Sequence, residues 1–299
     1  MKKLLFLIVS VVLTTVDSHA CNVCGCGVGN YHYGILPQFR KNFVGVRYRY
    51  STYTSRLDDS HVNPYSHETF QTAELWGRFY PARKIQAFIF VPFNFNERNE
   101  GTDVKNVKGL GDIVLSANYN VLNTYDSLAA VKHNLLVGGG VKLPTGEFQA
   151  IENGLTVNQN FQLGTGSIDF LVNLIYTIRY KNIGLNSEFT STINTMNSDE
   201  YRFGNTARAG LTAFYVLRSG ALTLMPNVGM SGAFFNDNEQ FGVEFPDTGG
   251  WASLVNVGTE IYYRGTAFGF SYSHPGKQGL FNNKVTANDR VSMHLTFMF

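Results

Sequence analysis

The carboxyl end of the chain alternates strictly between apolar and polar side chains. One face carries only apolar side chains: Val291, Met293, Leu295, Phe297 and Phe299. The other face carries polar side chains: Ser292, His294 and Thr296. A repeat of two residues is the period of a β-strand, and a strand with one fully apolar face suits a closed barrel that turns this face toward lipid. A soluble β-sandwich can end in the same way, so the other segments of the chain must distinguish a membrane barrel from a sandwich.

Eleven further segments show the same alternation, and helical spacing fits them less well. In residues 168–179, for example, Phe170, Val172 and Leu174 share the face opposite Asp169. The pattern predicts twelve strands, with ten or fourteen as the alternatives. They are residues 44–51, 73–80, 85–96, 112–121, 132–142, 168–179, 185–192, 202–215, 220–235, 250–263, 266–274 and 289–299.

The connections between these segments are of two kinds. Short turns occur at residues 81–84, 180–182, 218–220 and 263–266, and long polar loops occur near 54–66, 96–109, 144–166, 236–249 and 275–288. Bacterial barrels place short turns in the periplasm and longer loops outside the cell. Residues 154–164 could be a further strand, but this strand would break the alternation of short and long connections. We therefore expect one long outer loop over 144–166, an even strand number and both termini in the periplasm.

The start of the chain resembles an export signal. Lys2 and Lys3 precede an apolar run over residues 4–13, and Ser18 and Ala20 are the small residues that a signal peptidase reads. We expect a signal peptide over residues 1–20, with a membrane anchor as the alternative. The mature chain would then begin at Cys21, which could carry lipid, although the residues before it match a lipobox poorly. We expect a Cys-rich segment over 21–37, which lies at the periplasmic mouth or inside the lumen as a plug, and a barrel over 38–299.

Composition is consistent with an exported barrel of one domain. About 280 residues follow Ala20, and no later stretch has the ~20 apolar residues that a membrane helix needs. The mean hydropathy of −0.09 would suit a soluble protein, but half of every barrel strand is polar. The chain holds 16 Tyr and 24 Phe, as aromatic girdles at both lipid interfaces require. A net charge of +2 does not indicate a nucleic-acid partner.

Three segments in the middle of the chain are similar to an outer-membrane family named for the meta-pathway of phenol degradation. They are residues 109–112 (GLGD), residues 140–146 (GVKLPTG), and residues 164–167 (GTGS) with Asp169. The resemblance covers roughly residues 70–299 and rests on turn-forming segments, since Pro144 and Gly146 mark a strand that leaves the sheet. It implies an outer-membrane barrel that passes small or hydrophobic compounds, and it does not identify the solute.

If the apolar faces meet lipid, the polar faces line the lumen. The charged residues expected there are Arg47, Arg49, Glu74, Arg78, Asp112, Lys142, Asp169, Arg179, Glu188, Arg202, Arg208 and Glu260. Mixed charges in a confined interior should pair, because an unpaired buried charge is costly. These pairs could simply hold the barrel together, or they could form a polar constriction that selects solutes. A hydrophobic passage would instead need inward apolar side chains, for which Trp76, Phe88 and Phe90 are the candidates.

The three cysteines of the chain lie together at the expected mature start. Cys21, Cys24 and Cys26 offer three thiolates on a Gly-rich segment, and His32 could be a fourth ligand. Soft sulfur donors of this kind suit Cu(I) or Zn. A disulfide between Cys21 and Cys24, formed in an oxidising periplasm, is the alternative.

These observations favour a channel or transporter-like barrel for small solutes. The alternatives are a metal-binding accessory barrel that uses the Cys segment and a closed barrel with a structural role. No nucleophile–base pair indicates an enzyme. The expected partners are outer-membrane lipid, a small-molecule solute and the barrel-assembly machinery, whose recognition signal the terminal Phe299 resembles.

Overall fold

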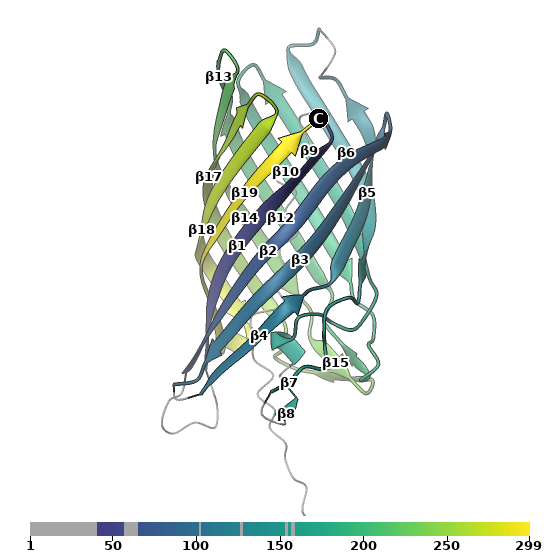
Figure 1. The fold of residues 1–299 in the computed structure, drawn as a ribbon, viewed down its shortest axis with the longest axis vertical. Coiled ribbons are helices and arrows are strands. Elements are labelled where there is room, and N and C mark those ends of the chain that lie inside the picture. The colour runs from purple at the N-terminus through teal and green to yellow at the C-terminus, as the bar shows by residue number, and fades with distance from the viewer. Residues whose placement is uncertain (1–40, 57–64, 102, 126–127, 153–154, 157–158) are drawn as a thin grey trace, which may run out of the picture.

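The protein folds into a closed antiparallel β-barrel (Figure 1). The computed structural model describes residues 41–56, 65–101, 103–125, 128–152, 155–156 and 159–299. Each wall strand pairs with its neighbours along the chain, and pairing of the last strand with the first closes the ring. The predicted twelve-stranded barrel is confirmed. Among the described residues, no helix is both long and apolar enough to cross a bilayer.

Two of the twelve wall strands are built from two pieces each. A break at Gly111-Asp112 separates β4 from β5, and Val216 separates β12 from β13. The wall consists of β1 (Phe43–Arg56), β2 (Tyr65–Ala82), β3 (Ile85–Asn99), β4 (Val104–Leu110), β5 (Ile113–Asn123), β6 (Val131–Leu143), β9 (Asp169–Tyr180), β10 (Ile183–Ile193), β12 (Thr206–Tyr215), β13 (Leu217–Ser219), β14 (Leu222–Phe235), β17 (Gly250–Tyr263), β18 (Thr266–Leu280) and β19 (Val285–Met298).

Tight turns join β2 to β3, β9 to β10, β13 to β14 and β17 to β18 at the end of the barrel where the chain terminates (Figure 1). The turn after β17 uses Arg264 and Gly265, both with positive φ, which suits a two-residue hairpin. The three longest connections, which join β6 to β9, β10 to β12 and β14 to β17, lie at the opposite end, and the connection between β5 and β6 lies with the tight turns. Because short turns face the periplasm in bacterial barrels, the C-terminal end is the periplasmic one.

The extracellular connections contain small elements of their own. They are β7 (Ile151–Glu152), β8 (Leu155–Thr156), η3 (Gln159–Phe161), β11 (Tyr201–Arg202), β15 (Asn238–Gln240), β16 (Val243–Phe245) and η4 (Phe281–Asn283). The strands β11, β15 and β16 form a separate three-stranded sheet.

The predicted loops 96–109 and 275–288 are shorter than expected. The strands β3 and β4 pair as far as Asn99 and Val104, and β18 extends to Leu280. The predicted strand 202–215 is too long at its start, because the wall begins at Thr206 and Arg202 belongs to the extracellular sheet. These extensions lie beyond the lipid, where no apolar face marks a strand.

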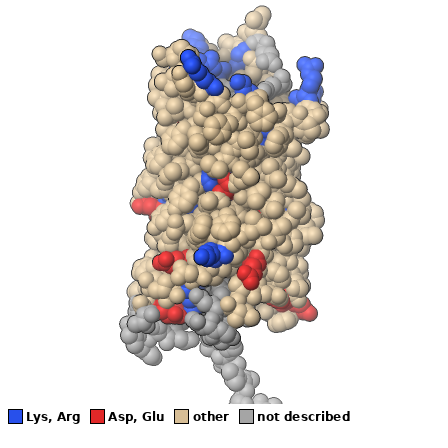
Figure 2. Space-filling view, viewed as in Figure 1, with Lys and Arg blue, Asp and Glu red and all other residues tan. Residues whose placement is uncertain are grey.

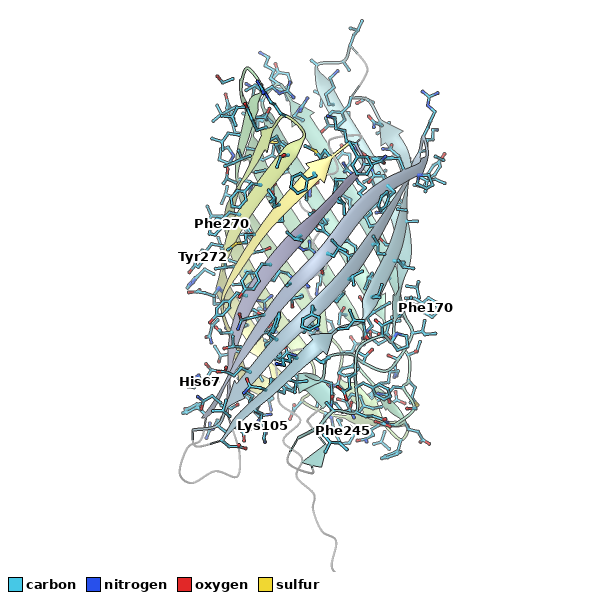
Figure 3. The ribbon with its side chains drawn as sticks, in the orientation of Figure 1. His67, Lys105, Phe170, Phe245, Phe270 and Tyr272 are labelled. Carbon is cyan, nitrogen blue, oxygen red and sulfur yellow. The ribbon has the colours of Figure 1, made fainter. Side chains whose placement is uncertain are left out.

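The outer surface of the wall is apolar. Figure 2 shows one side of the barrel with few charged side chains over its middle, and with basic side chains gathered at the C-terminal end. Phe170 and Phe270 point away from the barrel in Figure 3, with exposed fractions of 52% and 40%. Val46, Leu75 and Leu174 are similarly exposed on their strands. Such a belt requires a hydrocarbon environment, so the wall spans a membrane.

A charge placed on this outer belt should destabilise the barrel according to its depth. We expect Leu174→Arg, in the middle of β9, to lower the free energy of unfolding in lipid by about 2–4 kcal/mol. Leu217→Arg, beside a periplasmic turn, is the matched control and should cost about 0–1 kcal/mol. Urea unfolding of both variants in phospholipid vesicles measures the difference, and equal costs would mean that residue 174 does not face the lipid core.

Candidate functional site

A cavity of about 440 Å³ lies inside the barrel. Side chains from most wall strands line it, together with residues 159–165 of the connection between β6 and β9. The alternation of each strand sends every second side chain inward, so one barrel interior collects polar groups from segments far apart in the sequence. The volume is in the range of pockets that hold small molecules.

A belt of charged side chains crosses one wall of the cavity at a single level. Strand pairing places Glu260, Gly269, His294, Arg47 and Glu74 opposite one another in that order across β17, β18, β19, β1 and β2. His294 Nε2 lies 3.1 Å from a carboxylate oxygen of Glu260, although a whole strand separates the two. Gly269 permits this contact, since a β-carbon there would collide with both side chains. The absence of a side chain at Gly269 therefore allows Glu260 and His294 to contact each other across β18.

Two arginines share the buried carboxylate of Glu74. The guanidinium of Arg47 donates to Glu74 Oε1, and Arg49 Nη2 lies 3.1 Å from Glu74 Oε2. The Arg47 guanidinium carbon also lies 4.8 Å from the centre of the Trp76 ring and 5.4 Å from that of Phe90. Stacking on two rings and an ion pair fix Arg47, while the partly exposed Arg49 faces the cavity.

An apolar layer fills much of the lumen on the periplasmic side of this belt. Its largest side chains are fully buried, and ring contacts such as Phe43 with Trp76 at 4.6 Å connect them. The layer includes Phe43, Trp76, Phe88, Phe90, Leu136, Ile175, Phe214, Met225 and Tyr262. The barrel interior is thus polar around the cavity and packed like a protein core below it.

The connection between β6 and β9 covers the extracellular side of the cavity with residues 159–165. Its middle folds inward: Phe161 is fully buried and meets the ring of Phe70 on β2 at 5.9 Å. Leu163 is buried beside Val107, and its carbonyl oxygen accepts a hydrogen bond from Asn94 at 3.4 Å. We call residues 159–165 the inner loop. Its position makes it the roof of the cavity.

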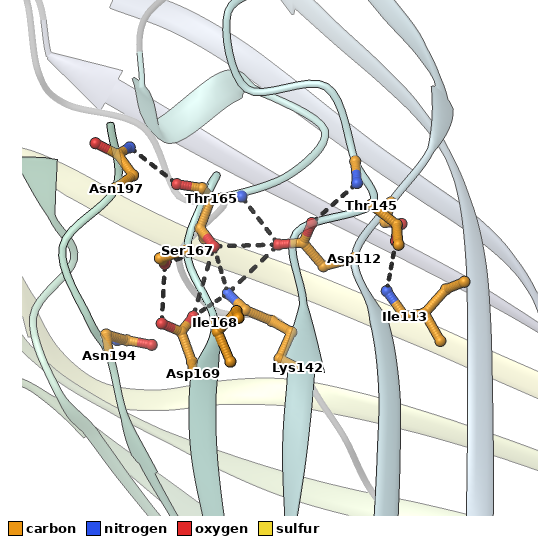
Figure 4. Close-up of polar contacts among 12 residues, drawn as sticks. Asp112, Ile113, Lys142, Thr145, Thr165, Ser167, Ile168, Asp169, Asn194 and Asn197 are labelled. Carbon is orange, nitrogen blue, oxygen red and sulfur yellow. Dashed lines mark hydrogen bonds and ion pairs between the residues drawn. The ribbon is translucent and has the colours of Figure 1, made fainter. Parts of the chain in front are cut away.

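A polar network anchors the inner loop to the barrel rim (Figure 4). The Asp112 carboxylate accepts hydrogen bonds from the backbone N–H groups of Gly146 at 3.0 Å and Thr165 at 2.9 Å. Lys142 Nζ lies 3.5 Å from Asp112, donates to the Thr165 hydroxyl at 2.8 Å and forms an ion pair with Asp169. All three charged residues are buried. We call Asp112, Lys142 and Asp169 the anchor triad.

The anchor triad unites the three turn segments singled out in the sequence, which follow β4, end β6 and precede β9. Two of their glycines meet where the backbones cross. A β-carbon on Gly146 would lie 2.9 Å from the Gly164 α-carbon, and one on Gly164 would lie 2.6 Å from the Gly146 carbonyl oxygen. The glycines are needed because no side chain fits between these two chain segments.

A methyl group at this crossing should displace the inner loop. We expect Gly164→Ala to cost about 1–3 kcal/mol in unfolding free energy, as overpacking usually does, and to make residues 159–165 more sensitive to protease. Gly210→Ala is the control, since its β-carbon would approach no atom more closely than 3.7 Å. Limited proteolysis of intact cells compares the two variants, and equal cleavage would contradict the crowded crossing.

The structure distributes the charged residues expected in the lumen over four places. Those that line the cavity are Arg47, Arg49, Asp112, Lys142, Glu188, Arg208 and Glu260. Glu74 and Asp169 lie buried behind them in ion pairs. Arg78 is buried at the periplasmic end, where it donates to the carbonyl oxygen of Lys41 at 2.8 Å, and Arg179 stacks on Tyr125 at 5.1 Å. Arg202 pairs with Glu239 in the extracellular sheet and does not lie on the wall.

Sequence reasoning missed several cavity residues. Arg290 has the same parity as Ser292 and His294 on the terminal strand, so the alternation alone could have placed it in the lumen. Phe161 and Leu163 carry no signal of an inward fold in the sequence, because their loop also holds other apolar residues, such as Phe148, Ile151 and Leu155. The contact between Glu260 and His294 has no signal either, because it depends on strand pairing.

The cysteine segment lies outside the described residues, as do the expected signal peptide and His32. Metal binding by Cys21, Cys24, Cys26 and His32 therefore stays a prediction. Within the described part of the chain, no group of three or more His, Cys, Asp or Glu side chains could hold a metal ion.

Comparison with known proteins establishes the fold. No protein-family model matches the sequence, and no curated protein matches it. The structure is similar to an outer membrane channel from Pseudomonas putida F1, with a TM-score of 0.67 and 13% identity over 87% of this chain and 95% of that chain. It is also similar to the β-domain of the Bordetella autotransporter BrkA, with a TM-score of 0.54 and 11% identity over 87% of this chain and all of that one.

With its apolar belt and closed wall, the protein is a β-barrel of the bacterial outer membrane. At these identities the likeness shows the fold alone. Membership of the phenol-degradation family stays a prediction, because no family model matches.

Proposed function

We propose that this barrel is a channel for small solutes, including hydrophobic ones, and that the lumen is their path. The observation that supports the proposal is the polar cavity between the inner loop and the apolar layer. The charged side chains at the cavity are paired or stacked, so they can border a path for solutes without the cost of an unpaired buried charge.

The cavity combines surfaces for polar and apolar parts of a solute. Arg49, Asn94 and Asn256 offer hydrogen bonds, and the rings of Tyr53, Phe70 and Trp76 offer apolar contact. This combination is typical of small-molecule sites, in which apolar walls give affinity and a few polar groups give orientation. It suits solutes of the size of one aromatic ring.

Solutes can leave the cavity toward the periplasm only if side chains of the apolar layer move aside. Its packed side chains close the lumen below the cavity in the described state. Rotamer changes of a few of these large side chains are the motion that the proposal requires. The proposed channel is therefore narrow, with a low permeability that falls steeply with solute size.

Liposome swelling tests the proposal. Purified protein in vesicles should admit small solutes such as glycine and arabinose and should exclude disaccharides. A shift in gel mobility on heating would establish that the protein in the same vesicles is folded. If folded protein admitted no solute, the barrel would be a closed structural one and the proposal would be wrong.

A further inference from the structure

Every tight turn at the periplasmic end of the barrel carries an exposed basic side chain, and Figure 2 shows such side chains gathered at this end. We call these five cations the basic ring: Arg83, Lys84, Lys181, Arg218 and Arg264. Among the described residues of these turns none is acidic, and no described acid forms an ion pair with the ring. Asp126, in the connection between β5 and β6, lies outside the described residues. The ring is therefore a band of positive charge without a protein partner in the described part of the chain.

The extracellular end has a different charge pattern. Its cations lie among acids: Lys105 pairs with Glu100 and Asp103, and Arg202 pairs with Glu239. The described extracellular connections also expose further acids, which are Glu97, Glu147, Glu200, Glu244 and Asp247. Charge is thus mixed at the extracellular end and uniformly basic in the periplasmic turns. Such an asymmetry favours an anionic partner on the periplasmic side only.

Three cations of the ring fold back over tyrosines of the outer surface. Lys84 Nζ lies 5.8 Å from the centre of the Tyr119 ring, and Lys181 Nζ lies 5.3 Å from that of Tyr180. The Arg264 guanidinium carbon lies 5.3 Å from the centre of the Tyr263 ring. The three tyrosines have exposed fractions of 49–50%.

Exposed tyrosines at the ends of membrane strands lie at the level of the lipid headgroups, with the ring in the interface. A cation that lies over such a ring is at the same depth as the phosphates of that leaflet. The turns that carry the ring follow β2, β9, β13 and β17, so they are spread around the barrel and do not form one patch. A partner that meets all of them at this depth has to surround the barrel, as lipid does.

From this arrangement we infer that the basic ring binds anionic phospholipid headgroups of the periplasmic leaflet. A lipid phosphate accepts charge-assisted hydrogen bonds from Lys and Arg. A zwitterionic headgroup carries its own cation, which repels the ring, so a headgroup with net negative charge should be preferred. The inference goes beyond the proposed channel function and does not depend on it.

Tryptophan reporters at the two ends of the barrel can measure this preference. The native Trp251 is exposed on the outer surface at the extracellular start of β17, and the other tryptophan, Trp76, is buried inside the lumen. A Tyr180→Trp, Trp251→Phe variant moves the lipid-facing reporter to the basic ring. The vesicles contain phosphatidylglycerol and phosphatidylcholine, and one of the two is brominated in turn. Fluorescence quenching then gives the lipid composition beside each reporter.

We expect phosphatidylglycerol to be favoured about fivefold beside the reporter at position 180, which corresponds to ~1 kcal/mol per Lys or Arg near an anionic surface. Beside Trp251 we expect no preference. Lys181→Gln should remove most of the preference at position 180, whereas Lys105→Gln, at the extracellular end, is the matched control and should leave it unchanged. High salt should weaken it, because exposed charges are screened.

Equal quenching by the two lipids beside position 180 would overturn the inference. An equal preference for phosphatidylglycerol at both reporters would also overturn it, because the charge asymmetry would then have no effect. A preference that survives both Lys181→Gln and replacement of all five cations by Gln would contradict the role of the ring. A shift in gel mobility on heating establishes that each variant is folded. With any of these results, the basic ring would be left as a surface for an acidic macromolecule of the periplasm.

Discussion

Lys142→Met should release the inner loop and destabilise the barrel strongly. The substitution removes the cation between Asp112 and Asp169 and leaves two buried carboxylates without it. Breaking a buried ion pair by removing one partner usually costs about 3–5 kcal/mol. We expect a fall of this size in the unfolding free energy, measured in urea, and faster protease cleavage within residues 159–165.

Lys105→Met is the matched control for this prediction. Lys105 lies on β4 and forms ion pairs with Glu100 and Asp103 at 3.6 Å, but about a third of its side chain is exposed. An exposed pair contributes about 0–1 kcal/mol, so the control should be nearly neutral. Similar costs for the two variants would mean that the anchor triad is solvated and does not hold the loop.

Phe90→Ala should open the lumen toward the periplasm. Phe90 is fully buried in the apolar layer and lies between the rings of Trp76 and Phe88, whose centres are 6.3 and 6.1 Å from its own. Truncating a buried Phe leaves a cavity and costs about 3–5 kcal/mol. Because this void adjoins the polar cavity under Arg47, we expect the conductance in planar bilayers to rise several-fold.

A Phe→Ala substitution on the outer surface tests whether the higher conductance comes from opening the apolar layer or from a general loss of stability. Phe170→Ala removes an identical side chain that faces lipid (Figure 3). It should leave the conductance unchanged. If Phe90→Ala conducted no better than the parent while still folding, the apolar layer would not be the barrier, and solutes would have to cross elsewhere.

The strand number and the inward faces could be predicted because the lipid imposes them. On a wall strand such as β9, every second residue must be apolar over the whole thickness of the membrane, so Phe170, Val172 and Leu174 show the register directly. Outside the lipid this constraint ends. The extension of β3 and β4 and the sheet that holds Arg202 therefore had no periodic signal, and their bounds were predicted wrongly.

The roof of the cavity could not be predicted, for a different reason. The three turn segments were recognised as similar to those of a known family, but their meeting at Asp112 and Lys142 depends on contacts over 23 to 53 residues of sequence. A sequence pattern reports local geometry, and such contacts appear only when the barrel closes. The charges were found by parity, whereas their partners required strand pairing.

The central claim is that solutes pass through the lumen. The most direct test is to block the lumen with a bulky group attached inside it. In a chain whose three native cysteines are replaced by serine, Ser292→Cys places a thiol in the cavity, and Leu295→Cys places one on the lipid face. A bulky methanethiosulfonate reagent should abolish most of the bilayer current of the first variant and spare that of the second. Undiminished current after complete labelling of Ser292→Cys would contradict a path through the lumen.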